Sequence, residues 1–243
     1  MFDTIKFDKG NVKMVAHRGV SGIETENTAL AFVAAGNRSY FGIETDVHVT
    51  SDGGFVIMHD SMTGRVAEID VEIEKTDLKE LRKIRLKDRE DGAVRNDIRI
   101  PELDDYVKIC KRYGKIGVLE IKTPFKEQEL KDMVTIIEKR DYLKSIIFIS
   151  FHLENLLALR RILPEMQKLQ FLCGELSDET IGVLIKNHID IDIHYPTLLS
   201  HPEYMAKFKE GGVEVNAWTC DNVIDAGLLK DMGVDYITSN ILE

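Results

Sequence analysis

Eight short runs of β-branched or apolar residues recur along this chain, and their spacing is the feature that most constrains its fold. They span residues 12–16, 43–49, 116–121, 146–151, 168–172, 190–194, 213–218 and 234–238. Between them lie segments with helical periodicity, such as the stripe formed by Leu130, Val134 and Ile137. Since these connections are too long for hairpins, we expect parallel strands. Eight such units in 243 residues predict an α/β fold of the (β/α)8 TIM-barrel class rather than an open doubly wound sheet.

One charged stretch interrupts this alternation. Between Asp60 and Arg99, 21 of 40 residues are charged, and no buried-strand signal is evident. The preceding turn at residues 52–54 predicts a hairpin that returns through residues 55–58. We interpret residues 60–100 as an insertion after the second strand, lying over the barrel mouth, with one polar helix at residues 77–84. Residues 1–243 contain no linker or low-complexity tract, which predicts a single catalytic domain.

The end of this insertion carries a helix signal of its own. Pro101 is expected to occupy the first turn of a helix over residues 102–113, because proline is favoured at a first helical position.

Charge and cysteine usage limit the partners. The net charge of −10 repels nucleic acids and anionic lipid headgroups, so we expect no nucleic-acid binding and no stable membrane association. No run approaches the roughly 20 apolar residues of a membrane span, and the N-terminus lacks a signal-peptide pattern. Cys110, Cys173 and Cys220 form neither a metal-ligand spacing nor a disulfide framework, which favours a cytoplasmic location. Nothing in the sequence predicts the oligomeric state.

Ionisable residues gather where the first three predicted barrel strands end. Functional side chains of this barrel class lie at the carboxyl ends of strands and in the loops that follow. Glu44 and Asp46, spaced i and i+2, share one face of a strand, and so do Glu120 and Lys122. The full set is His17, Arg18, Glu44, Asp46, His59, Glu120 and Lys122. Individually each could be structural, for example as a buried Glu120–Lys122 ion pair, but their convergence at one end favours a site.

The chemistry of this set points to a phosphate ester. Three carboxylates facing one another cannot all stay ionised without a counter-charge, and oxygen ligands favour one divalent cation such as Mg²⁺, Ca²⁺ or Mn²⁺. Arg18 and Lys122 are then available for phosphate oxygens. Phosphodiester cleavage needs a base and an acid, and His17 and His59 can supply both. His48 is expected to be a polar residue lining the site.

The chain resembles the glycerophosphodiester phosphodiesterase family over nearly its whole length. The early motifs are His17-Arg18-Gly19, Glu26-Asn27-Thr28, Glu44-Thr45-Asp46, Asp52-Gly53 and His59-Asp60. The later motifs are Ile100-Pro101-Glu102-Leu103, Leu119-Glu120-Ile121-Lys122, Ser150-Phe151, Val215-Asn216-Ala217-Trp218-Thr219 and Gly233-Val234-Asp235-Tyr236-Ile237-Thr238-Ser239. Thr25 departs from the proline that many members carry, which is expected to alter loop stiffness more than chemistry.

The resemblance implies an activity and a role for each site residue. The activity is metal-dependent release of sn-glycerol 3-phosphate from small glycerophosphodiesters such as glycerophosphocholine and glycerophosphoethanolamine. In members of this family, the insertion after the second strand is associated with shaping the glycerol end of the site. The implied roles are metal ligation for Glu44, Asp46 and Glu120, acid–base catalysis for His17 and His59, phosphate contact for Arg18 and Lys122, and a place in the same polar shell for Asn27.

Several alternatives stay open. Phe151 and Trp218 end two predicted strands and either line the site, where a choline-like head could make cation–π contact, or pack at the barrel top. The rival activities are a lysophospholipase D, a metal-dependent sugar-phosphate isomerase or aldolase, and phosphate binding without turnover. We favour His17 as base and His59 as acid, with attack by the substrate's own glycerol hydroxyl through a cyclic phosphate. The swapped roles and direct attack by water remain alternatives.

Overall fold

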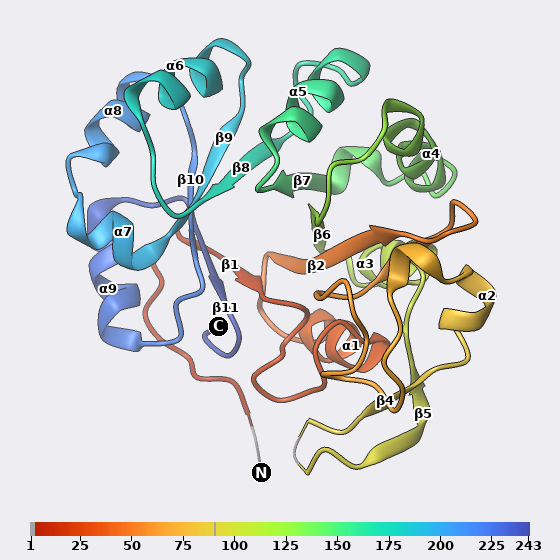
Figure 1. The fold of residues 1–243 in the computed structure, drawn as a ribbon. Coiled ribbons are helices and arrows are strands. Elements are labelled where there is room, and N and C mark those ends of the chain that lie inside the picture. The colour runs from red at the N-terminus through yellow and green to blue at the C-terminus, as the bar shows by residue number, and fades with distance from the viewer. Residues whose placement is uncertain (1–2, 90) are drawn as a thin grey trace.

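The computed structural model describes residues 3–89 and 91–243, which contain the predicted (β/α)8 TIM barrel (Figure 1). Its parallel strands are β1 (Lys13–Ala16), β2 (Gly42–Val49), β6 (Ile116–Ile121), β7 (Ile146–Ser150), β8 (Leu169–Cys173), β9 (Asp190–His194), β10 (Val215–Trp218) and β11 (Tyr236–Ser239). They follow the order β1-β11-β10-β9-β8-β7-β6-β2, and β2 pairs with β1 to close the barrel. Each run predicted from the sequence overlaps one of these strands.

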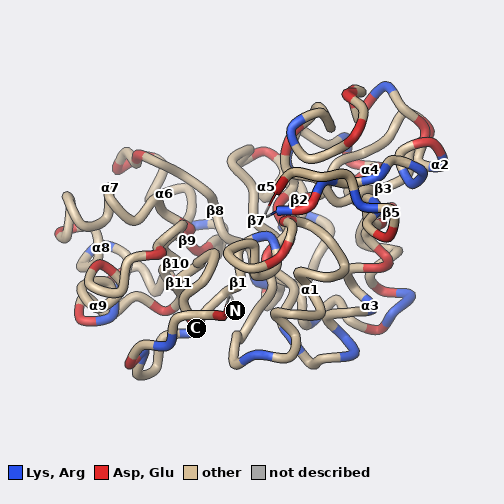
Figure 2. Tube along the Cα trace, turned by 90° about the horizontal axis from the view of Figure 1, so that it is seen from below, with Lys and Arg blue, Asp and Glu red and all other residues tan. Residues whose placement is uncertain are grey.

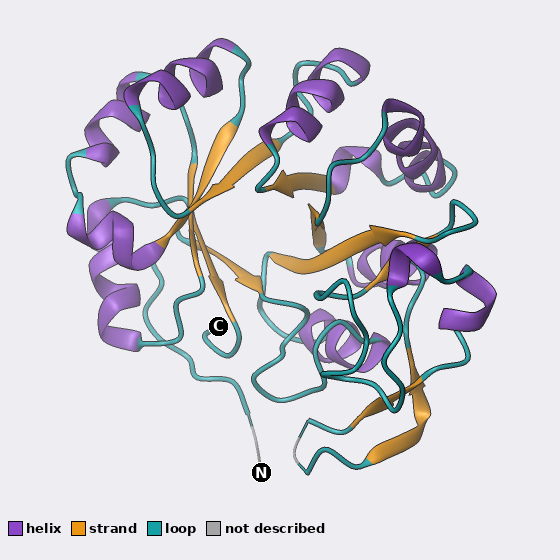
Figure 3. Cartoon of the chain, in the orientation of Figure 1, coloured by secondary structure: helices purple, strands orange, loops and turns teal. Residues whose placement is uncertain are grey.

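Helices surround the barrel, as Figure 3 shows. They are α1 (Ala29–Gly36), α3 (Leu103–Tyr113), α4 (Glu127–Glu138), α5 (Leu153–Ile162), α6 (Asp178–Lys186), α7 (Tyr195–Ser200), α8 (Tyr204–Glu210) and α9 (Val223–Met232). The predicted stripe Leu130, Val134 and Ile137 is the buried face of α4. Pro101 lies just before the N-cap residue Glu102 of α3 rather than in its first turn, so this detail of the prediction is wrong.

The barrel interior is filled rather than open. Val15, Val118, Ile149 and Leu172 pack with Ile147 and Tyr236 into a separate apolar cluster. These residues alternate along their strands with those of the main core, which lies between the strands and the helices. The barrel is therefore a rigid support for polar side chains at the carboxyl ends of its strands.

The segment after β2 contains more structure than its charge suggests. The predicted hairpin is present, since β3 (Phe55–Ile57) pairs antiparallel with β2. The following elements are η1 (Ile73–Lys75), α2 (Leu78–Leu81), β4 (Arg85–Lys87) and β5 (Val94–Arg99). Here α2 is shorter than the helix predicted over residues 77–84, and the β4–β5 hairpin was not predicted. The buried side chain of Ile98 is flanked along β5 by exposed and half-buried polar ones, which hides the strand signal.

This segment has its own apolar cluster and contacts the loop after β1. Ile73, Leu81, Leu86, Ile98 and Ile100 pack together with Val56, Met58, Ala67 and Ile84. The hydroxyl of Thr25 donates to the Lys87 carbonyl at 3.1 Å, and Arg89 Nε donates to the Ser21 carbonyl at 2.7 Å. The interpretation of residues 60–100 as one insertion in a single domain stays a prediction.

Charged residues of both signs are spread over the helices and the segment after β2 (Figure 2). None of the helices in the described chain is both long and apolar enough to cross a membrane. The three cysteines are buried and free among the described residues.

Candidate active site

Three buried carboxylates meet where β2 runs beside the carboxyl end of β6. These strands pair in parallel, which sets Asp46 opposite Glu120, while Glu44 lies two residues earlier on the same face of β2. One oxygen from each of Glu44, Asp46 and Glu120 lies within 4.8 Å of the others. The strand register thus brings together the three acids predicted as metal ligands.

The protein supplies too little positive charge for this cluster. Burial and the neighbouring carboxylates raise the pKa of Glu44 well above its ordinary value and that of Glu120 to about 7. Burial also disfavours ionised Asp46, but Lys122 and Arg18 outweigh it and lower the pKa of this carboxyl. Asp46 is therefore the acid of the three whose ionised form is favoured, whereas the ionised forms of Glu44 and Glu120 are disfavoured.

A divalent cation fits these residues. Asp46 Oδ1 is buried and has no hydrogen-bond partner among the described residues, although Lys122 Nζ lies 3.2 Å away as an ion pair. An ion bound there would supply the missing charge and a partner for this oxygen. Three carboxylates form a hard, all-oxygen ligand set, which suits Mg²⁺, Ca²⁺ or Mn²⁺.

Lys122 and Arg18 both form ion pairs with the carboxylates. Lys122 Nζ is 2.7 Å from Glu120 Oε1. Arg18 Nε lies 3.6 Å from Asp46 Oδ2, and its NH1 group is 3.0 Å from Glu26 Oε1. Arg18 has a φ of 50°, which directs its backbone N–H to Glu44 Oε2 at 2.6 Å. Both predicted cations therefore stand beside the predicted metal ligands, where they can meet a phosphate.

The side chain of Asn27 contacts the carboxylate of Asp46. Its Nδ2 donates to Asp46 Oδ2 at 2.7 Å, and its Oδ1 accepts from the Thr45 hydroxyl at 2.7 Å. These two bonds fix the orientation of the amide and thereby that of Asp46. Asn27 therefore lies beside Asp46, which is one of the three predicted metal ligands.

The two predicted catalytic histidines have different partners. His17 Nδ1 lies 2.7 Å from Asn240 Oδ1, whereas His59 Nδ1 lies 2.6 Å from Asp60 Oδ1. Burial, helped by the charge of Arg18, lowers the pKa of His17 to about 4. Burial also lowers the pKa of His59, and the charge of Asp46 opposes that effect. One histidine thus has a neutral amide as partner and the other a carboxylate.

A cavity of about 60 Å³ joins these groups. It is lined by His17, Arg18, Glu44, His59, Glu120, Lys122, Ile149, Phe151, Leu172, Asp192, Trp218 and Thr238. Phe151 and Trp218 form its aromatic side, with ring centroids 5.5 Å apart at 88°. The Trp218 ring is held by a hydrogen bond of 3.0 Å from Nε1 to the Asp192 carbonyl. Both aromatic residues therefore line the cavity, and they also pack on each other.

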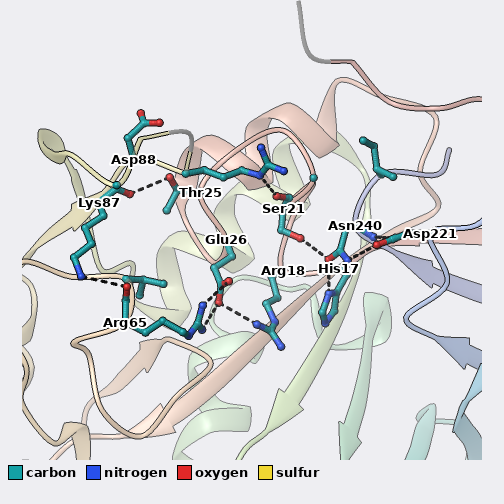
Figure 4. Close-up of a pocket in the computed structure, with 15 residues that line it drawn as sticks. His17, Arg18, Ser21, Thr25, Glu26, Arg65, Lys87, Asp88, Asp221 and Asn240 are labelled. Atoms are coloured by element: carbon teal, nitrogen blue, oxygen red, sulfur yellow. Dashed lines mark hydrogen bonds and ion pairs between the residues drawn. The ribbon is translucent and has the colours of Figure 1, made fainter.

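A second cavity of about 700 Å³ borders the first and shares His17 and Arg18 with it (Figure 4). Its walls come from the loop after β1, the β4–β5 hairpin and the segment that follows β11. Glu26 lies in this wall, where it accepts from Arg18 at 3.0 Å and from Arg65 at 2.7 Å. The larger cavity has charged side chains of both signs in its walls and lies next to His17.

The predictions from the sequence missed some residues of the site and misplaced one. Glu26 and Asp60 stood in recognised motifs but had no assigned role, and Arg65, which joins them, was one of many charges in its segment. His48 was expected to line the site, yet it lines neither cavity. Its Nε2 lies 3.2 Å from the His59 carbonyl, so it supports the loop that carries His59.

Comparisons with known proteins agree with this geometry. The profile of the glycerophosphoryl diester phosphodiesterase family matches residues 17–242. The chain is 25% identical over 237 residues to a glycerophosphodiester phosphodiesterase of Caldanaerobacter subterraneus subsp. tengcongensis, covering 93% of each.

Two solved structures have the same fold. A glycerophosphodiester phosphodiesterase from Parabacteroides distasonis superposes with a TM-score of 0.78 at 27% identity, covering 95% of this chain and 93% of that one. An Oleispira antarctica phosphodiesterase in complex with the product sn-glycerol-3-phosphate superposes with a TM-score of 0.84 at 24% identity, covering 98% and 96%.

Proposed function

Since this chain belongs to the glycerophosphoryl diester phosphodiesterase family and is a phosphodiester hydrolase, we propose that it cleaves glycerophosphocholine, glycerophosphoethanolamine and similar small diesters to sn-glycerol 3-phosphate and an alcohol. The observation that carries this proposal is the cavity that joins His17 and His59 to Glu44 and Glu120. The product bound to the Oleispira antarctica phosphodiesterase supports the choice of glycerol phosphate.

Glu44, Asp46 and Glu120 would hold one divalent cation, with Mg²⁺, Ca²⁺ and Mn²⁺ as candidates. When bound, the ion would supply positive charge beside the phosphate and relieve the repulsion among the carboxylates. Asn27 would keep Asp46 in its ligating orientation through their 2.7 Å hydrogen bond.

The different partners of the histidines support distinct roles. His59 donates from Nδ1 to the Asp60 carboxylate, which stabilises an imidazolium and suits a general acid. His17 has the amide oxygen of Asn240 as partner of Nδ1, which leaves Nε2 of the neutral ring free to accept a proton and suits a general base. His17 would take the proton of the substrate's glycerol hydroxyl, and His59 would protonate the departing alcohol.

Attack by the glycerol hydroxyl would form a cyclic phosphate that water then opens. Direct attack by water would give the same final product without this intermediate. Phosphorus NMR of the reaction mixture separates the two routes, because a cyclic phosphate has its own resonance and appears only along the first.

Arg18 and Lys122 would bind the non-bridging phosphate oxygens. Arg18 offers a planar set of donors and Lys122 a point charge, and both already lie within 4 Å of acidic oxygens that a metal would neutralise. Phe151 is 46% exposed and Trp218 is half-buried, so the aromatic side of the small cavity is accessible to one end of the substrate. We assign these two rings to substrate contact.

The expected partner is a small soluble diester. A net charge of −10 disfavours nucleic acids and stable binding to anionic lipids. A cytoplasmic location also stays a proposal, and it rests on three buried cysteines that form no disulfide among the described residues.

A substrate panel tests this function. Glycerophosphocholine, lysophosphatidylcholine and a sugar phosphate would each be incubated with enzyme and Mn²⁺, and the products followed by phosphorus NMR. We expect glycerol phosphate from glycerophosphocholine and little change in the other two. Preferential cleavage of the lysolipid would overturn the substrate assignment and favour a lysophospholipase D.

A further inference from the structure

We propose that Asn240 and Asp221 are positioning residues that hold His17 in one tautomer, with the proton on Nδ1 and the lone pair on Nε2. The inference rests on the proposed function in one respect, namely that His17 acts as the base. Neither residue is a candidate for metal or phosphate binding. Both lie on loops at the carboxyl ends of barrel strands: Asp221 after β10 and Asn240 directly after β11.

The Asp221 carboxylate fixes the direction of the Asn240 side chain. Asn240 Nδ2 donates to Asp221 Oδ2 at 2.6 Å, and the Asn240 backbone N–H donates to Asp221 Oδ1 at 2.7 Å. Ser239 Oγ is the third donor to this carboxylate and donates to Oδ1 at 2.7 Å. An ionised carboxylate only accepts hydrogen bonds, so the amide nitrogen of Asn240 must face Asp221 and its oxygen must face the other way.

That oxygen points at His17. Asn240 Oδ1 lies 2.7 Å from His17 Nδ1 and accepts from Ser21 Oγ, also at 2.7 Å. Figure 4 shows Asp221, Asn240 and His17 in a row, with Ser21 beside the amide. A carbonyl oxygen cannot donate, so His17 Nδ1 must carry the hydrogen. In the neutral ring the lone pair then lies on Nε2.

The free nitrogen faces the reactive side of the site. His17 Nε2 lies 4.0 Å from Glu44 Oε2, at the edge of the small cavity. The backbone holds this arrangement in register, since the His17 N–H donates to the Ser239 carbonyl at 2.9 Å and the Gly22 N–H to the Asn240 carbonyl at 2.8 Å. The chain Asp221–Asn240–His17 therefore leaves the proton-accepting nitrogen free at the small cavity.

An amide is suited to orient a base. Its oxygen orients the ring through one hydrogen bond of 2.7 Å, yet it adds no negative charge next to the imidazole. His59 offers the contrast, because its Nδ1 partner is the Asp60 carboxylate at 2.6 Å. The orientation of the Asn240 amide is set by Asp221, which contacts Asn240 on the side away from His17.

The tautomer can be observed directly in the full-length protein. Histidine labelled with ¹⁵N gives long-range proton–nitrogen correlations that distinguish a protonated ring nitrogen from a bare one, and the His17 signals are those lost in His17→Ala. We expect Nδ1 of His17 to be protonated and Nε2 bare in the metal-free protein. In Asn240→Ala this signature should change to mixed or inverted tautomers, with kcat lower by about 10–100-fold and a KM changed by less than about threefold.

Two further variants separate orientation from contact. Asp221→Ala leaves Asn240 in place but frees its amide to turn, so we expect mixed tautomers and a smaller loss of kcat than in Asn240→Ala. Asp231→Asn removes one acidic charge near the C-terminal end of α9 and serves as the matched control, with an unchanged spectrum and activity. Thermal unfolding of each variant identifies any that fail to fold, and Asp221→Ala then carries the test.

The outcomes distinguish this inference from the proposed function. A bare Nδ1 in the wild type, or a tautomer unchanged in both Asn240→Ala and Asp221→Ala, would overturn the role of Asn240 and Asp221 even in an active phosphodiesterase. The predicted spectra in a protein that cleaves no glycerophosphodiester would support the positioning role and refute the proposed substrate instead.

Discussion

Replacing Glu120 with glutamine should stabilise the metal-free protein and abolish its response to metal. Glu120 is 7% exposed and lies beside Asp46. Burial and that neighbouring carboxylate raise its pKa from 4.5 to about 7. Glutamine has nearly the same shape and cannot ionise. The substitution thus removes the cost of the buried charge together with one of the proposed metal ligands.

The sign and size follow from the two pKa values. Between pH 4.5 and about 7 the unfolded chain has released a proton that the folded protein retains, so stability falls as pH rises through this window. Above this pH window, the folded wild type also carries the ionised carboxylate, and the full loss of folding stability is about 3 kcal/mol. Below it both states are protonated and the cost is absent. The variant escapes this loss, because its amide stays neutral throughout.

Urea unfolding in EDTA measures the effect. The stability of Glu120→Gln relative to wild type should rise by about 2–3 kcal/mol between about pH 5 and about pH 8. Adding Mn²⁺ should then stabilise the wild type and leave the variant unchanged. Glu179→Gln, at an exposed position on α6, is the matched control and should show no such pH dependence. A difference between Glu120→Gln and wild type that stays constant over this range would refute the clustered-carboxylate account.

Three further predictions test other parts of the structure. Metal binding near pH 6.5 should release protons, because Glu44 and Glu120 have raised pKa values. Calorimetry in buffers of different ionisation enthalpy would show this release as a binding heat that depends on the buffer, and equal heats in all buffers would contradict it. Leu81→Ala should cost about 2–5 kcal/mol in urea unfolding because Leu81 is fully buried, whereas the same change at Leu228, which is 50% exposed, should cost less than about 1 kcal/mol. Arg18→Lys should lower kcat/KM by about 10–100-fold in steady-state assays, since lysine cannot form two parallel bonds to a phosphate; wild-type kinetics would rule out bidentate binding.

The barrel and its three carboxylates could be predicted because both depend on local sequence patterns. Alternating strand and helix signals define parallel units, and the i, i+2 spacing of Glu44 and Asp46 places them on one face whatever surrounds them. Parallel pairing then brings Glu120 opposite Asp46. The residues that carry the chemistry therefore follow from strand periodicity and the direction of pairing.

The supporting residues could not be predicted in this way. Asn240 meets His17 across 223 positions of sequence, and the contact exists because β11 pairs with β1 when the barrel closes. Its position two residues after a predicted strand was the one available signal. Arg65 joins Glu26 to Asp60, but it lies in a segment where charge is so common that no single residue stands out.

The β4–β5 hairpin escaped prediction for a related reason. Two half-buried residues flank Leu86 in β4, and Ile98 is the one buried residue of β5. A single buried side chain in a short strand leaves too little alternation to recognise among charged neighbours. The hairpin becomes evident only when Leu86 and Ile98 join the apolar cluster beneath it.

The release of sn-glycerol 3-phosphate from glycerophosphocholine tests the central claim most directly. Wild-type protein and His17→Ala would be compared with Mg²⁺, Ca²⁺ or Mn²⁺ and with EDTA. We predict release that requires a divalent metal and falls by about 10²–10⁴-fold in His17→Ala. Release that persists in EDTA, or an undiminished rate in His17→Ala, would contradict the proposed site, and the absence of release with every metal would contradict the proposed substrate.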